Sequence, residues 1–127
     1  YMADTGLFVS MLEDGTQFDI LNGNLFGYKG AIFENLIADI FSKMNRRLYY
    51  FRKDSGLELD FVIRHKGQCT PVEVKANDGN AKSVKTVLKH PEKYHVESAI
   101  KLADLNLGRK DGILTLPLYM AFLLTER

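Results

Sequence analysis

Hydrophobic and polar residues alternate in two neighbouring stretches of the chain, residues 58–63 and residues 71–75. Both stretches are rich in β-branched and aromatic residues, so each predicts a strand. The Lys66-Gly67 pair between them predicts a hairpin turn. A turn of even length centred there pairs residues whose numbers add up to the same odd value, which fixes the expected register.

That register brings like charges together. It sets Asp60 opposite Glu73 and Glu58 opposite Lys75, with all four side chains on one face. Two ionised carboxylates about 5 Å apart repel each other by about 3 kcal/mol at an effective dielectric constant near 20. A neighbouring cation, a proton held by one acid or a divalent metal ion would compensate for the repulsion. A surface hairpin of mixed charge is the alternative, and a slip by one residue would separate the acids.

A helical stripe of apolar residues follows a different period. It predicts a helix over residues 30–44 with one face broad enough to pack on a sheet, formed by Phe33, Leu36, Ile37, Ile40, Phe41 and Met44. Glu34 borders the core side of this stripe. An acid there is either a solvated surface residue or a functional group that faces the sheet.

The remaining segments predict shorter elements. We expect a helix over 6–13, a loop over 14–26 in which Leu25 and Phe26 cover core edges, strands over 46–53, 96–102 and 113–116, a helix over 81–89, a basic turn over 108–112 and a final helix begun by Pro117. Asp4 or Thr5 is expected to cap the first helix and Asn80 the helix over 81–89. This order predicts a mixed sheet with helices on its faces.

The bulk composition fits one soluble globular domain. The chain has 127 residues, of which 46% are hydrophobic and 26% charged, and its formal net charge is +1. This charge gives no global argument for nucleic-acid binding, so such an argument must rest on local patches. The longest nearly apolar run, residues 113–124, is shorter than the roughly 20 residues of a membrane span.

The single cysteine, Cys69, excludes an intramolecular disulfide and fits a reducing, cytoplasmic compartment. We expect it to be a small buried hydrophobe. His65, His90 and His95 lack the spacing of a zinc site.

Two basic stretches are candidates for phosphate contacts. Basic and aromatic residues alternate over 46–53, which includes Arg52, and Lys82, Lys85 and Lys89 share one face of the helix expected over 81–89. Such patterns hold nucleic-acid backbones. They are also typical of solvated faces and of strands that cover a core edge.

The acidic residues and Lys75 together resemble the core of the PD-(D/E)XK nuclease-like superfamily. Glu34 matches its helix acid, Asp60 and Glu73 match its two strand acids, and Lys75 matches its lysine. The resemblance implies a restriction-endonuclease-like α/β fold, in which a mixed sheet of about four to five strands is flanked by helices.

A narrower resemblance covers nearly the whole chain. It is carried by Tyr1-Met2-Ala3-Asp4-Thr5-Gly6-Leu7, Gly30-x-x-x-Glu34-Asn35, Glu58-Leu59-Asp60-Phe61, Pro71-Val72-Glu73-Val74-Lys75, Lys82-Ser83 and Leu116-Pro117-Leu118-Tyr119. These segments are similar to the uncharacterised domain that ends many prokaryotic AAA+ ATPases. The chain is therefore expected to be one domain, with a lead-in over 1–29 and a core over 30–127, and to be a fragment of a longer ATPase. It has no Gly-x-x-x-x-Gly-Lys-Ser/Thr loop, so we expect no ATPase activity from it.

The resemblance implies a metal-dependent nuclease that cuts DNA. Asp60, Glu73 and the backbone carbonyl of Val74 would hold Mg²⁺ or Mn²⁺, with Glu34 anchoring a second ion or a bound water. Lys75 would orient the attacking water and neutralise the scissile phosphate. Arg52, Lys82 and Lys85 would contact the DNA backbone.

Two other classes of function stay open. The domain can be a non-catalytic DNA-binding or protein-binding module that regulates the ATPase, and an ion pair between Glu58 and Lys75 would favour this reading by holding the lysine away from chemistry. It can also be a dimerisation domain.

Overall fold

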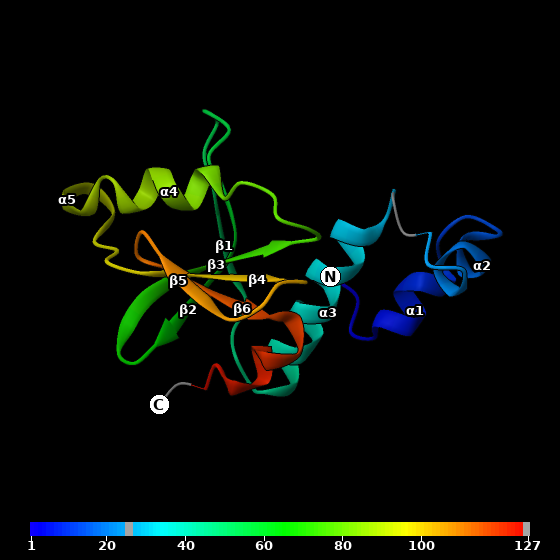
Figure 1. Ribbon diagram of the computed structural model, residues 1–127. Coiled ribbons are helices and arrows are strands. Elements are labelled where there is room, and N and C mark those ends of the chain that lie inside the picture. Colours follow the sequence, from blue (N-terminus) through cyan, green and yellow to red (C-terminus); the bar gives the residue numbers. More distant parts are fainter. Residues whose placement is uncertain (25–26, 126–127) are drawn as a thin grey trace.

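A mixed six-stranded sheet forms the centre of the protein. The computed structural model (Figure 1) describes residues 1–24 and 27–125, and Leu25 and Phe26 lie outside them. Within these residues the strand order is β1-β2-β3-β4-β6-β5, one strand more than the sequence predicts. The strands are β1 (Tyr49–Arg52), β2 (Glu58–His65), β3 (Gln68–Lys75), β4 (Ala99–Ala103), β5 (Gly108–Lys110) and β6 (Ile113–Pro117). The expected fold class, a mixed α/β sheet with flanking helices, is confirmed.

Helices cover both faces of the sheet. They are α1 (Thr5–Ser10), α2 (Thr16–Leu21), α3 (Lys29–Lys43), α4 (Lys82–Leu88), α5 (Pro91–Tyr94) and the 3₁₀ helix η1 (Leu118–Leu123). In Figure 1, α4 and α5 lie on one side of the sheet and α3 and η1 on the other, while α1 and α2 lie beyond α3. No helix in the described part of the chain is long and apolar enough to cross a membrane.

The hairpin has the expected register. His65 pairs with Gln68 and Phe61 with Val72. The two residue numbers of each pair add up to 133, the odd value that the predicted register requires. Lys66 and Gly67 have positive φ values of 50° and 78°. Two consecutive left-handed residues make a type I′ turn, whose twist matches that of the flanking strands. The prediction of a turn of even length centred at Lys66-Gly67 is confirmed, and its length is two residues.

A β-bulge interrupts the other side of β2. Tyr49 pairs with Val62 and Phe51 with Leu59, so three steps along β2 match two steps along β1. As a result, Leu59 packs on the α4 side of the sheet, whereas Phe61 packs on the α3 side. Asp60 lies inside the bulge, a feature that commonly redirects a side chain.

Each face of the sheet has its own hydrophobic core. The larger core joins the buried stripe of α3 to β2, β3 and β4 and includes Ile37, Phe41, Phe61, Val72 and Leu102. The smaller core lies under α4 and includes Leu59, Val84, Val87, Ala99 and Ile113. Val72 and Val74 of β3 both belong to the larger core, so Glu73 between them projects to the opposite face of the sheet.

Four local predictions are corrected or refined. Residues 16–21 form α2 instead of a loop, although Phe18 and Leu21 stay exposed, because local backbone bonds suffice for a short helix. The first helix ends at Ser10, and Asp4 caps it by accepting a hydrogen bond from the Leu7 amide at 2.8 Å.

Of the strand expected over residues 46–53, only Tyr49–Arg52 form a strand, β1. The final helix is the 3₁₀ helix η1, which begins directly after Pro117.

Three further predictions were wrong. Residues 108–110 form the edge strand β5, and only Asp111 and Gly112 make the turn, because an edge strand can pair through its backbone with all its side chains exposed. Asn80 does not cap α4; its side chain accepts a bond from Lys85. Cys69 is exposed, since it lies opposite Arg64, one pair away from the turn at the end of the hairpin.

Candidate functional site

Asp60 turns from the bulge towards β3. The β2–β3 ladder ends at the pair Phe61 and Val72, and the next amide of β3 that faces β2 belongs to Val74. That amide donates a hydrogen bond to Oδ2 of Asp60 at 2.8 Å. The side chain of Asp60 therefore replaces the backbone partner that the bulge has moved away, and continuing the register places it opposite Glu73.

Glu73 is buried in the middle of the sheet. Its exposed fraction is only 4%. One carboxylate oxygen, Oε1, lies 2.6 Å from Nζ of Lys75. The other, Oε2, is buried and has no hydrogen-bond partner within the described residues. A buried carboxylate oxygen without a partner is energetically costly, so Glu73 is suited to accept a further cation or donor.

The environment of Asp60 favours its protonated form. Burial and, after it, the charge of Glu73 raise the pKa of Asp60 to about 7, and Glu34 adds to the effect. The Val74 amide and Lys75 act in the opposite direction. The repulsion expected between Asp60 and Glu73 is thus relieved in part by a cation on Glu73 and in part by a proton on Asp60.

Lys75 forms its ion pair with Glu73 and not with Glu58. Burial alone would lower the pKa of Lys75, but the bond to Glu73 and the charges of Asp60 and Glu34 raise it overall, so the lysine stays protonated. Glu58 is exposed, and it pairs in the sheet with Arg52 of β1. The ion pair considered between Glu58 and Lys75 is therefore replaced by one between neighbours on the same strand.

Tyr1 closes the helix side of the site, which sequence patterns did not reveal. Its hydroxyl donates a hydrogen bond to Oε1 of Glu34, and its ring lies 5.3 Å from that of Phe61. Burial and the bond to Glu34 raise the pKa of the Tyr1 phenol above its ordinary value. Glu34 is thus half-buried, and its charge acts on both Asp60 and Lys75.

Asn35 fixes the segment that carries Tyr1. Its side chain is 2% exposed and accepts a hydrogen bond from the Met2 amide at 2.7 Å. It also donates to the Met2 carbonyl at 3.3 Å and to Oγ1 of Thr5 at 3.4 Å. The adjacent residues Glu34 and Asn35 therefore both bind the N-terminal segment, Glu34 through Tyr1 and Asn35 through Met2 and Thr5. These contacts join residues at least 30 positions apart, so the periodicity of a single helix or strand does not predict them.

The three expected phosphate contacts lie on β1 and α4, which carry none of the four expected catalytic residues. Arg52 and Lys82 are exposed, at the end of β1 and the start of α4 respectively. Lys85 donates to Oδ1 of Asn80 at 2.6 Å and lines a hollow on the α4 side of the sheet. Lys101 of β4, which the sequence did not single out, lines the same hollow.

The donor set fits a hard cation bound by few protein ligands. Asp60 and Glu73 supply carboxylate oxygens, and Oε2 of Glu73 has no other partner among the described residues. The Val74 carbonyl points to the same side of β3 as its amide, towards Asp60. No group of three or more His, Cys, Asp or Glu side chains in residues 1–24 and 27–125 is arranged to hold a metal ion. Mg²⁺ commonly uses one or two carboxylates and keeps several waters, so two acids are compatible with it.

Comparison with known proteins identifies one family. A family model described as "Domain of unknown function (DUF4143)" matches residues 29–120, which include all four predicted site residues. Searches of curated proteins and of solved structures gave no match.

Proposed function

The chain belongs to the family described as domain of unknown function (DUF4143), and for this member we propose a Mg²⁺-dependent or Mn²⁺-dependent phosphodiesterase activity on DNA. Glu73, with one oxygen paired to Lys75 and the other without a partner in the described chain, is the observation that carries the proposal. The resemblance to the PD-(D/E)XK nuclease-like superfamily supports the same assignment. The resemblance of the whole chain to the domain that ends many prokaryotic AAA+ ATPases suggests that it works beside an ATPase module. The single Cys69 fits a cytoplasmic location.

The proposed ligand set is the one that the resemblance implies, and the contacts of Asp60 and Glu73 support it. Asp60, Glu73 and the Val74 carbonyl would hold the metal ion, with Glu34 near a bound water. When bound, the ion would lower the pKa of water and stabilise negative charge on the phosphate. Its charge would also favour the ionised form of Asp60, whose pKa of about 7 keeps it near half-protonation at neutral pH.

Lys75 has two roles in this proposal. In the metal-free protein it neutralises Glu73 across 2.6 Å. With the metal ion bound to Glu73, the ammonium would be available to orient a water molecule and to contact a non-bridging phosphate oxygen. Its raised pKa keeps it a cation, so it would act through hydrogen bonds and charge and not as a general base.

A cleavage assay with matched variants tests the proposal. The full-length protein is incubated with single-stranded, duplex and branched DNA in Mg²⁺, in Mn²⁺ and in chelator. We expect metal-dependent products that Asp60→Asn and Glu73→Gln abolish and that Lys75→Met slows by about a hundredfold or more. Glu58→Gln is the control, because it changes an exposed acid two residues from Asp60. Cleavage that survives Asp60→Asn would overturn the assignment.

A second candidate function is a non-catalytic module that binds DNA or protein for the ATPase. The short ion pair between Glu73 and Lys75 favours it, because a lysine can hold a carboxylate in place permanently. This candidate predicts no metal binding at the site. A Mg²⁺ titration by calorimetry separates the two, since only the first proposal requires binding that Asp60→Asn removes.

A further inference from the structure

A polar row runs across the sheet beside the candidate site. Glu73 of β3 pairs in register with Lys101 of β4, and Lys101 pairs with Thr115 of β6. Parallel neighbours in register project to the same face, here the face that α4 covers. Lys101 is therefore one strand away from Glu73, about 4.8 Å across the sheet.

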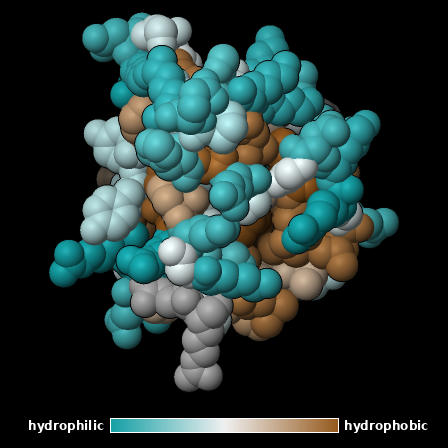
Figure 2. Space-filling view, turned by 90° about the vertical axis from the view of Figure 1, so that its left-hand side faces the viewer, coloured by the Kyte–Doolittle hydropathy of each residue, from teal (hydrophilic) through white to brown (hydrophobic). Residues whose placement is uncertain are grey.

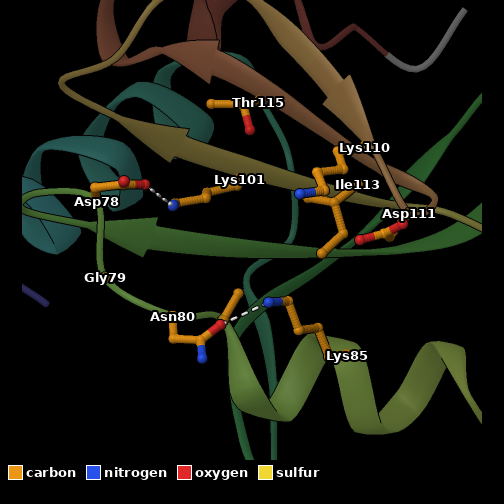
Figure 3. A pocket seen from close by; sticks show the side chains of 10 residues that line it. Asp78, Gly79, Asn80, Lys85, Lys101, Lys110, Asp111, Ile113 and Thr115 are labelled. Atoms are coloured by element: carbon orange, nitrogen blue, oxygen red, sulfur yellow. Dashed lines mark hydrogen bonds and ion pairs between the residues drawn. The ribbon is translucent and has the colours of Figure 1, made fainter.

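Beyond Glu73 this row opens into a hollow of about 260 Å³. Figure 3 shows Lys101 from β4, Lys85 from α4 and Lys110 from β5 around it, with Asn80 and Thr115 on its walls. The volume is below that of most sites for drug-sized ligands, so the hollow suits a small group. Seen from the side of α5, the surface shows hydrophobic residues between hydrophilic ones (Figure 2).

Lys101 is the unusual member of this group. Its exposed fraction is 9%, and its ammonium lies 3.4 Å from Oδ1 of Asp78. The side chain of Asp78 is itself 88% exposed. A buried ammonium needs a close anion, and a long contact to a solvated carboxylate compensates it poorly.

The charges of the other two lysines, Lys85 and Lys110, are not neutralised by an acid within the described residues. Lys85 donates to the neutral amide oxygen of Asn80. In the described part of the chain, neither Lys85 nor Lys110 forms an ion pair with a carboxylate. Three ammonium groups thus line one small space, together with the hydroxyl of Thr115 and the acid Asp78. Asp111 also lines the hollow and limits its net positive charge.

We propose that this hollow binds a phosphate group, with Lys101 as the central ligand and Lys85 and Lys110 at its sides. A phosphate offers several charged oxygens to donors that converge from different elements, and lysine binds it as a point charge. The phosphate displaces Asp78 from Lys101. The proposal does not require the carboxylate site to cleave anything. The phosphate can come from a small free ligand or from the end of a nucleic-acid strand, since Lys101 adjoins the candidate site.

Calorimetric titration with inorganic phosphate tests the site directly. We expect Lys101→Met to weaken binding at least tenfold and Lys85→Met to weaken it several-fold. Lys89→Met is the matched control, because this lysine is at the end of the same helix and does not line the hollow. Asp78→Asn should tighten binding several-fold, since it removes the competing anion.

Two oligonucleotides distinguish the sources of the phosphate. They share one sequence, and one carries a 5′-phosphate while the other carries a 5′-hydroxyl. A preference for the phosphorylated strand that Lys101→Met removes would identify a strand end as the ligand. Saturable binding of inorganic phosphate without such a preference would identify a small phosphate-bearing ligand.

A structural role for Lys101 makes the opposite prediction. If its contact with Asp78 only ties the loop to the sheet, then both Lys101→Met and Asp78→Asn lower the free energy of unfolding and leave phosphate binding unchanged. That result overturns the proposal. Equal losses of affinity in Lys85→Met and Lys89→Met would also overturn it, because they would show unspecific attraction. If Lys101→Met does not fold, the Asp78→Asn and Lys85→Met titrations decide.

Discussion

The ammonium of Lys75 neutralises the carboxylate of Glu73, and the side chain of Glu73 is far more buried than that of Lys75. The side chain of Glu73 is 6% exposed and that of Lys75 is 30% exposed. The two residues are two positions apart on β3, so both project to the same face. Lys75 can therefore reach solvent or a ligand without leaving its strand, whereas Glu73 depends on whatever lies beside it.

This dependence predicts a large asymmetry between two lysine substitutions. Lys75→Met leaves Glu73 buried without a cation and should lower the free energy of unfolding by about 1–3 kcal/mol. Lys29→Met is the matched control: Lys29 is 32% exposed, but its partner Asp104 is 75% exposed, so the loss should stay below about 1 kcal/mol. Urea denaturation measures both. In the Lys75→Met background, Glu73→Gln should recover much of the loss, and failure to do so would contradict the role of the pair.

Asp60 predicts a dependence of stability on pH. Its pKa of about 7 in the folded protein lies above the ordinary value of 3.8. Between these values the folded state keeps a proton that the unfolded chain has released, so this group's contribution to stability falls as the pH rises from 4 to 7 and is constant above. Asp60→Asn removes this dependence and, after allowance for solvent screening, should stabilise the metal-free protein at pH 8 by about 1–2 kcal/mol.

Thermal unfolding of metal-free protein across pH 4 to 8 measures this effect. Glu58→Gln serves as the control and should keep the slope of the wild type, because Asp60 is unchanged in it. An Asp60→Asn variant with the wild-type slope would show that another group is responsible.

Asn35 predicts a local loss of order. Asn35→Ala removes the side chain that binds both backbone groups of Met2 and leaves them without that partner. We expect the free energy of unfolding to fall by about 1–3 kcal/mol. Amide hydrogen exchange should also rise in α1 well before it rises in β3, since α1 packs on α3 through this segment. Uniform acceleration throughout the chain would contradict a local role.

The hairpin turn offers a stabilising substitution. Lys66 adopts a positive φ of 50°, which asparagine tolerates better than lysine. Lys66→Asn should therefore raise the free energy of unfolding by about 0.5 kcal/mol, and Gly67→Ala, at φ 78°, should lower it by about 1 kcal/mol. Both changes are remote from Asp60 at the other end of the strand, so thermal shifts should occur without a change in metal or phosphate binding.

Sequence patterns predicted the parts of the site that depend on local order. The turn at Lys66-Gly67 and the alternation of both strands fixed the register of the hairpin, and with it the neighbourhood of Asp60 and Glu73. The apolar stripe of α3 likewise placed Glu34 beside the core. These features repeat with the period of a single strand or helix, which makes them readable from the chain.

Other parts depend on partners that no local period reveals. The bulge at Asp60 exists only relative to β1, and the contact of Tyr1 with Glu34 joins residues 33 positions apart. Lys101 becomes a neighbour of Glu73 through a parallel pairing across the α4–α5 crossover. The edge strand β5 has only exposed side chains, so its pattern resembles that of a loop.

The position of β3 between an antiparallel and a parallel neighbour has a consequence for how the protein folds. Its pairing with β2 closes a two-residue turn, whereas its pairing with β4 requires the chain from Lys75 to Ala99 to cross over first. Short loops close sooner than long ones, so the two carboxylates should meet early and Lys101 should join them late. The repulsion between Asp60 and Glu73 is then present before α4 covers that face, and Lys75, from the same strand, is the cation already at hand to relieve it.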